Sequence, residues 1–185
     1  MRNLRVYLKA LEESGHLKAV TEEVDCSIEA ATVAATSYQE VGPALHFQKL
    51  KDYSADYSLA SGIFSGPGNL YYEKFKYWSR TCIAMGVDPD MSYDKFMATC
   101  MERVEHPILP VAVESGPVKE VVMIGDEIDV TALPIPFIHP GDGGRYSTLQ
   151  IMMVKDFDSD WVVWENVRTM VVDGKRLVSN WAENS

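Results

Sequence analysis

The sequence has few basic residues for its length. Among 185 residues, 17 are Lys or Arg and 27 are Asp or Glu, so the formal net charge is −10. This balance argues against a nucleic-acid binder, which usually carries a basic face, and against a protein held on anionic lipid by basic residues. No apolar run approaches the roughly 20 residues of a membrane-spanning helix, and the N-terminus has no apolar signal core. We therefore expect a cytoplasmic protein.

Cysteine is also scarce, and no two cysteines form a C-x-x-C pair. The three cysteines are Cys26, Cys82 and Cys100, and the four histidines are scattered along the chain. A zinc site needs clustered ligands, so this pattern favours reduced thiols, with Cys82 and Cys100 on apolar helix faces in the core.

The first 105 residues alternate helical and strand-like patterns. Leu4, Leu8 and Leu11 predict a first helix that Gly15 ends, and Ser27 can cap a second helix that ends at Gly42. Further helices are expected over 70–85 and 92–104, and strands over 17–24, 44–50 and 58–64. In the last helix, apolar residues recur at helical spacing, which is typical of a core-facing side; they are Tyr93, Phe96, Met97, Cys100, Met101 and Val104.

The pattern changes after Pro107 to an almost all-β sequence. Strands are expected over 111–113, 121–124, 148–154, 161–172 and 177–181. Asp173-Gly174 signals a hairpin turn, and 156–160 forms a second, acidic turn. We therefore divide the chain into an α/β domain, 1–112, and a β segment, 113–185. The β segment has too few strands to cover its sheet edges, so it is expected to be a fragment or to be completed by another chain.

Two segments of the β part could carry chemistry. The glycine-rich turn at 141–146 could bring backbone N–H groups and Arg145 to a phosphate, or it could simply link two β segments at the surface. Arg168 lies inside the apolar strand 161–172 and needs an anionic or carbonyl partner, because it stays charged. That partner could be a structural ion pair or a bound anion. The acidic cluster at 126–129 indicates a solvated turn.

The order of these motifs resembles UbiD-type decarboxylases. The resemblance is carried by residues 4–25, by G-P-A-L-H-F at 42–47, by L-P-I-P at 133–136 and by H-P-G-D-G-G-R-Y at 139–146. The strand that ends at Arg168 also matches in place and character. The resemblance spans residues 4–178, which is only the N-terminal portion of that family.

The resemblance implies a prenylated flavin mononucleotide (prenylated FMN) cofactor, bound with Mn²⁺ and K⁺. It also implies reversible decarboxylation of aromatic or α,β-unsaturated acids. The expected fold is an α/β domain followed by the beginning of a split β-barrel of the flavin-binding kind, α+β overall. Larger members of the family assemble through a C-terminal domain.

The resemblance also assigns site residues. Arg168 falls on the family's catalytic arginine, which holds carboxylates near the flavin. Asn166 and Val167 fall on the backbone that lines the flavin, and Thr148 on a cofactor-contacting threonine. The family's metal-ligating asparagine is replaced here by Val163, which cannot ligate a metal, so no metal ligand is assigned. Glu165 is the one candidate substitute.

Three hypotheses follow. The first is the N-terminal part or small subunit of a UbiD-type carboxy-lyase, inactive until a second UbiD-type chain supplies the missing glutamates. The second is an accessory subunit that has lost the cofactor and braces a full-length homologue. The third is a generic flavin-binding or interaction domain. None involves nucleic acid or a membrane.

Overall fold

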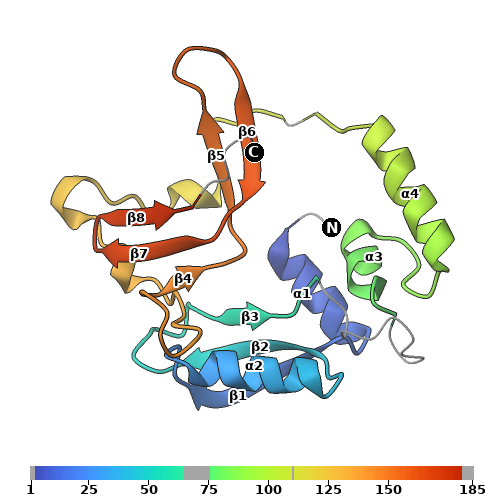
Figure 1. Cartoon of the computed structure of the whole chain (residues 1–185), viewed down its shortest axis with the longest axis horizontal. Helices are drawn as coiled ribbons and strands as arrows, with labels where there is room; N and C mark the ends of the chain where they lie inside the picture. The colour runs from blue at the N-terminus through green and yellow to red at the C-terminus, as the bar shows by residue number, and fades with distance from the viewer. Residues whose placement is uncertain (1–2, 65–75, 110, 181–185) are drawn as a thin grey trace.

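A computed structural model describes residues 3–64, 76–109 and 111–180, which form a mixed α/β fold with three small sheets (Figure 1). The first half contains α1 (Leu4–Glu13), β1 (Leu17–Val24), α2 (Glu29–Gln39), β2 (Ala44–Leu50), β3 (Leu59–Ser61), α3 (Ser79–Met85) and α4 (Tyr93–Glu105). The second half contains the 3-10 turns η1 (Pro117–Lys119), η2 (Gly125–Glu127) and η3 (Val130–Ala132), then β4 (Tyr146–Ser147), β5 (Ile151–Lys155), β6 (Val162–Asn166), β7 (Thr169–Asp173) and β8 (Arg176–Ser179).

The first sheet has the order β1-β2-β3. Strands β1 and β2 are parallel and are joined through α2, whereas β3 pairs antiparallel with β2. Four of the seven residues of β2 are buried; Phe47 is fully buried and packs with Ala30 of α2, which lies across the sheet (Figure 1). On the other side, Tyr7 and Leu11 of α1 pack with Ile83 of α3. The predicted helices and strands of this half are confirmed, but two are shorter than expected: residues 62–64 continue no strand and 76–78 are not helical. Residues 70–75 of the third expected helix lie outside the described ranges.

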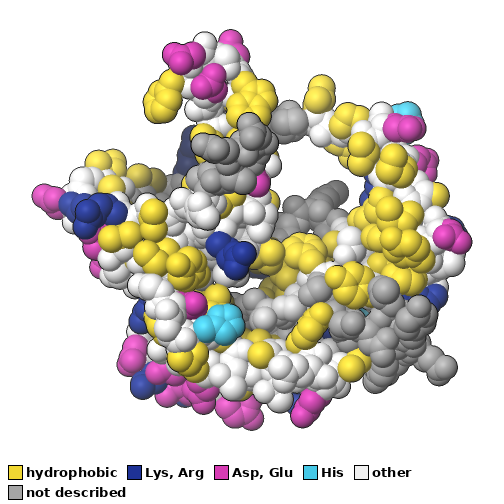
Figure 2. Space-filling view, in the orientation of Figure 1, with side chains coloured by type: hydrophobic (Ala, Val, Ile, Leu, Met, Phe, Trp, Pro, Cys, Tyr) yellow, Lys and Arg dark blue, Asp and Glu magenta, His cyan; other side chains and the backbone are white. Residues whose placement is uncertain are grey.

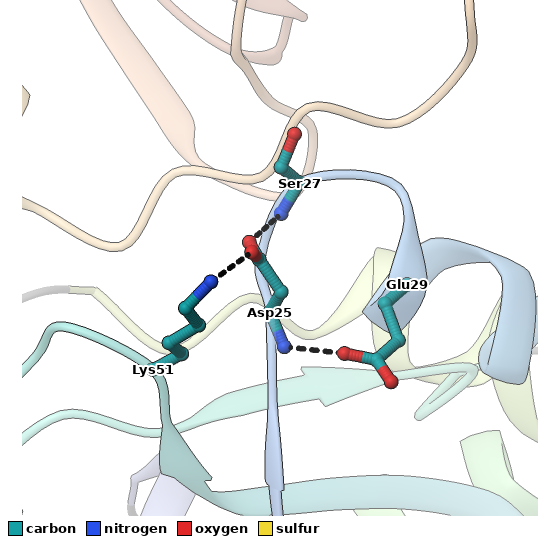
Figure 3. Close-up of polar contacts among 4 residues, drawn as sticks. All are labelled: Asp25, Ser27, Glu29 and Lys51. Carbon is teal, nitrogen blue, oxygen red and sulfur yellow. Dashed lines mark hydrogen bonds and ion pairs between the residues drawn. The ribbon is translucent and has the colours of Figure 1, made fainter.

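The start of α2 differs from the prediction, because Ser27 is not its cap. Figure 3 shows the Asp25 carboxylate accepting a hydrogen bond from the Ser27 N–H (2.7 Å) and pairing with Lys51 (3.3 Å). The Glu29 carboxylate accepts from the Asp25 N–H (2.8 Å), and the Ala30 N–H donates to the Asp25 carbonyl. Asp25 therefore organises the turn before α2. By contrast, Ser92 caps α4 as predicted, by accepting from the Lys95 N–H.

A buried tyrosine and a buried arginine join the elements around the first sheet. The Tyr7 hydroxyl lies within hydrogen-bonding distance of the carbonyl oxygens of Ile63 and Arg80 (2.9 Å for Arg80). Arg80 is 2% exposed and donates to the carbonyl oxygens of Gly62 (2.7 Å) and Gly42 (3.0 Å). These bonds join α1, α3 and the ends of β2 and β3.

Burial raises the pKa of Tyr7 to about 12, which makes the fold sensitive to alkaline pH. An unfolded tyrosine ionises near pH 10, so the stabilisation is complete below pH 10 and is lost as pH rises through 12. Through this group, we expect the wild-type chain to lose about 1–1.5 kcal/mol between pH 9 and pH 11, and Tyr7→Phe to lose none of it. The check is urea unfolding at pH 9, 10 and 11, with the exposed Tyr38→Phe as control. Equal pH slopes for the Tyr7→Phe and wild-type chains would contradict the prediction.

Helix α4 lies at the edge of the molecule, and its apolar side is not part of the core (Figure 1). Its first turn packs on Trp78 through Tyr93 and Phe96, but Met101 is 58% exposed and Val104 is 74% exposed. The prediction that this face and Cys100 are buried is therefore wrong for the described residues, whereas Cys26 and Cys82 are buried. Helical spacing identifies an apolar face but not whether anything covers it.

The second half has its strands in different places from those expected. Residues 111–113 and 121–124 form no strand, and the long strand predicted over 161–172 is two strands in different sheets, β5-β6 and β4-β7-β8. The hairpin turn at Asp173-Gly174 is confirmed, and so is the acidic turn between β5 and β6. Trp181 of the last expected strand lies outside the described residues.

The sheets of the described residues do not close into a barrel. The split barrel and the division at residue 112 therefore stay predictions. Within the same residues, no helix has the length and apolar character needed to cross a membrane.

Candidate functional site

The chain turns a corner between two sheets at Val167 and Arg168. Ser147 pairs with Thr169 in one sheet, and Ile151 pairs with Asn166 in the other. Residues 148–150 therefore stand opposite 167–168, with one extra residue on the first strand. Such a bulge disrupts the ladder and increases the local twist, so the pairing passes from one sheet to the other here and 161–172 is not a single strand.

Polar side chains satisfy the backbone at this corner, where ladder hydrogen bonds are missing. The Gln150 carboxamide nitrogen donates to the Val167 carbonyl and to the Thr169 hydroxyl (2.6 Å). The Asn166 amide donates to the Gln150 carbonyl (3.0 Å), and the Ser179 hydroxyl donates to the Arg168 carbonyl (2.8 Å). Since unpaired buried carbonyls are costly, these bonds fix the path of the chain through the corner.

An open cleft of about 1020 Å³ lies beside the corner and brings together all four residues that the resemblance assigned. Thr148, Asn166 and Arg168 are exposed along it, whereas Val167 is 7% exposed and forms part of its wall. The remaining lining residues are Ile138, His139, Asp142, Tyr146, Glu165, Met170, Val178, Ser179 and Asn180. The cleft thus combines an apolar wall with hydroxyl, amide and guanidinium donors.

The guanidinium of Arg168 has no ion pair or hydrogen bond with any residue that the structure describes. A structural salt bridge, one of the two alternatives for this residue, is therefore not found in this part of the chain. A free guanidinium beside an apolar wall can bind a carboxylate or phosphate through two parallel hydrogen bonds.

The glycine-rich turn is shaped by close packing on β7. A Cβ on Gly144 would lie 3.1 Å from both the Met170 Cγ and the Val171 carbonyl oxygen, and one on Gly143 would lie 3.2 Å from the Met170 sulfur. The turn is closed by the Asp142 carboxylate, which accepts from the His139 N–H (2.9 Å). The glycines therefore allow the turn to lie flat against the strand that follows Arg168.

Gly144→Ala is expected to lower the free energy of unfolding by about 1–3 kcal/mol, because the new methyl group overpacks Met170 and a backbone carbonyl. Gly116→Ala is the matched control, since a Cβ there meets nothing within 4 Å. Its effect should stay within about 0.5 kcal/mol. Urea unfolding of the two variants measures the difference, and equal midpoints would show that the turn does not need this glycine.

Arg145 does not reach the cleft. It donates to the Tyr53 hydroxyl (2.6 Å), and both residues line a separate hollow with Asp25 and Lys51. The possibility that Arg145 adds charge to a phosphate beside the glycine-rich turn is therefore not supported. Its contact instead joins the turn to the first half of the chain, as does the Phe137 backbone, which exchanges hydrogen bonds with Cys26 and Ile28.

In the part of the chain that the structure describes, the site offers no set of ligands that fits a metal ion. Val163 lies in β6 opposite Val154 and carries no ligand atom, while Glu165 lines the cleft. Among the described residues, no group of three or more His, Cys, Asp or Glu side chains could hold a metal.

Two residues at the corner were missed from the sequence. Gln150 and Ser179 fall within expected strands, but their side chains hydrogen-bond the backbone of Val167 and Arg168. A glutamine flanked by Leu149 and Ile151 in an apolar stretch was the available signal, because such an amide needs partners.

Comparisons with known proteins establish the family. Residues 8–100 match the model described as the 3-octaprenyl-4-hydroxybenzoate carboxy-lyase N-terminal domain, and 110–185 match the Rift-related domain of the same enzyme. The chain belongs to the UbiD family, which confirms the resemblance.

Among curated relatives, the chain is 30% identical over 179 residues to pyrrole-2-carboxylic acid decarboxylase of Pseudomonas aeruginosa. It is 28% identical over 177 residues to ferulic acid decarboxylase 1 of Saccharomyces cerevisiae. The matches cover 95% and 94% of this chain but only 35% of each relative. The chain thus spans about a third of the length of these decarboxylases.

Solved structures of UbiD-class enzymes also resemble this chain. Vanillic acid decarboxylase of Sedimentibacter hydroxybenzoicus (ShVdcCD) has a TM-score of 0.78 and 27% identity, over 97% of this chain and 36% of that one. A dimeric form of HmfF from Pelotomaculum thermopropionicum, in complex with prFMN, has a TM-score of 0.76 and 29% identity; the match covers 98% of this chain and 39% of the HmfF chain. The fold is therefore that of the corresponding part of UbiD-class enzymes.

Proposed function

We propose that this chain forms the N-terminal part or a small subunit of a cytoplasmic UbiD-type carboxy-lyase. The assembled enzyme would decarboxylate aromatic or α,β-unsaturated acids reversibly with prenylated FMN. The observation that carries the proposal is the cleft at the corner, where Thr148, Asn166, Val167 and Arg168 lie together. The chain would be inactive until further polypeptide completes the site.

The cleft suits a flavin and an acid substrate. Its apolar wall, formed by Val167, Met170 and Val178, is suited to a flat ring, and Thr148 and Arg168 supply donors to the same cleft. Ligand sites commonly combine such a wall with a few convergent polar groups. Because the residues present do not fit a metal, we assign no role here to Mn²⁺ or K⁺.

Each residue of the cleft has a distinct role in this proposal. Arg168 binds the substrate carboxylate and orients it, since the guanidinium geometry matches a carboxylate. Val167 and Met170 exclude water around the ring, and Thr148 donates to the cofactor. The prenylated flavin supplies the electron-accepting ring that makes loss of CO₂ possible when it is bound.

Exposed apolar surface supports the need for further polypeptide. The apolar band consists of the outer part of α4 and the segment after it; its members are Met97, Met101, Val104, Ile108, Leu109, Val111 and Val113, and all are exposed. Figure 2 shows hydrophobic side chains gathered over α4 beside an opening in the molecule. Surface of this kind usually marks an interface. ShVdcCD, one of whose structures contains a truncated ShVdcD, is a relative with more than one chain.

A non-catalytic accessory subunit remains the second candidate. It is favoured by Val163, which stands where the resembled family has a metal-ligating asparagine. In that case the chain would brace a full-length homologue, and the homologue would supply every catalytic group.

The two candidates are separated by an anaerobic assay of the assembly purified from its own host. CO₂ release from a panel of aromatic and α,β-unsaturated acids is measured with and without this chain. We expect activity to require the chain. Full activity of the partner alone would favour the accessory role, and an assembly that neither binds flavin nor releases CO₂ would contradict both candidates.

A further inference from the structure

We propose that Gln150 positions Arg168 for carboxylate binding, by holding the corner between β6 and β7 in place. This inference rests on the proposed function, because it concerns the residue assigned there to the substrate. Gln150 touches neither substrate nor cofactor in this account. It acts indirectly, by fixing the backbone on either side of Arg168.

The geometry of the corner carries the argument. Arg168 belongs to neither sheet, so no ladder of strand hydrogen bonds holds it. The side chain of Gln150 holds the residues on both sides of it, namely the Val167 carbonyl and the Thr169 hydroxyl. The Gln150 backbone holds a third neighbour, Asn166 (3.0 Å). One glutamine thus fixes three of the four residues nearest to Arg168 in this segment.

Burial makes these bonds hard to replace with water. Val167 is 7% exposed and Thr169 is 3% exposed, and the Gln150 Oε1 atom is also buried, without a hydrogen-bond partner in the part of the chain described. A shorter or apolar side chain at position 150 would leave the Val167 carbonyl with only a long hydrogen bond from the Thr169 hydroxyl (3.5 Å). The backbone would then have to move to reach solvent, and the direction of the Arg168 side chain would change with it.

The test compares Gln150→Leu with Gln48→Leu, a matched glutamine that is exposed on β2. Hydrogen exchange of peptides covering 162–173 is measured in the full chain, in the assembly with which it purifies. We expect Gln150→Leu to speed exchange at 166–169 by about tenfold, the worth of one ordinary hydrogen bond. Exchange in β1 and β2 should not change, and Gln48→Leu should behave as wild type. Unchanged exchange at 166–169 would overturn the proposal, whether or not the assembly binds flavin.

A second readout separates positioning of Arg168 from simple loosening of the corner. Benzoate, the simplest aromatic carboxylate, is titrated calorimetrically into the same assemblies. We expect Gln150→Leu to weaken benzoate binding about five- to tenfold, while the assembly stays folded with a melting temperature only a few degrees below that of Gln48→Leu. Wild-type affinity in Gln150→Leu would overturn the positioning role and leave the proposed function intact. Benzoate binding that also survives Arg168→Met would instead overturn the assignment of Arg168, and with it the role given to Gln150.

Discussion

Arg168→Met is expected to lower kcat/KM of the assembled enzyme for an aromatic acid by about 100-fold or more. Charge-assisted hydrogen bonds between a guanidinium and a carboxylate contribute about 1.5–3 kcal/mol each, and every 1.4 kcal/mol is tenfold. Arg168→Lys keeps the charge but loses the planar pair of donors, so we expect an intermediate loss. Anaerobic CO₂ release at several substrate concentrations measures both variants.

Arg176→Met provides the matched control. Arg176 lies on the neighbouring strand β8, and its guanidinium pairs with Asp173 at the hairpin (2.7 Å), outside the cleft. Its removal should change kcat/KM less than twofold, since exposed ion pairs are weak. If Arg168→Met were as active as Arg176→Met, Arg168 would not bind the substrate, and the accessory role would become the better account.

Arg80→Met should cause the largest loss of stability, about 3–5 kcal/mol. The substitution keeps most of the side-chain volume but removes the donors to the Gly42 and Gly62 carbonyls, in a place where the arginine is 2% exposed. Each buried carbonyl left without a donor costs about 1–3 kcal/mol. Urea unfolding followed by tryptophan fluorescence measures the effect, because Trp78 lies two residues away in sequence.

Arg103→Met is the control for the stability experiment. Arg103 donates to the Met85 carbonyl (2.8 Å), but it lies exposed on α4, where water can replace the bond. We expect a loss below about 1 kcal/mol. Equal unfolding midpoints for the two arginine variants would mean that Arg80 does not join α3 to the ends of β2 and β3.

The elements of the first half could be predicted because their signals are local. Leu4, Leu8 and Leu11 recur at helical spacing in α1, and Ser92 caps α4. The burial of α4 could not be predicted. Apolar residues at helical spacing, such as Met97, Met101 and Val104, form the same sequence pattern whether that helix face is buried or exposed. Burial of such a face depends on elements that the helix itself does not specify.

The candidate site was predictable only in part. Arg168 was identifiable because a charged residue in an apolar strand needs a partner. The corner could not be predicted, because it arises from a bulge at residues 148–150, opposite 167–168. The pairing register between distant segments cannot be inferred from the sequence of either segment alone. Gln150 was missed for the same reason, since its partner Val167 lies 17 residues away.

Native mass spectrometry of the chain purified anaerobically from its own host tests the central claim most directly. We predict an assembly in which this chain is joined to the rest of a UbiD-type enzyme, carrying a flavin-sized adduct. The partner's mass would distinguish a complementary half from a full-length homologue. A bare species of 20.7 kDa without flavin would contradict a composite carboxy-lyase.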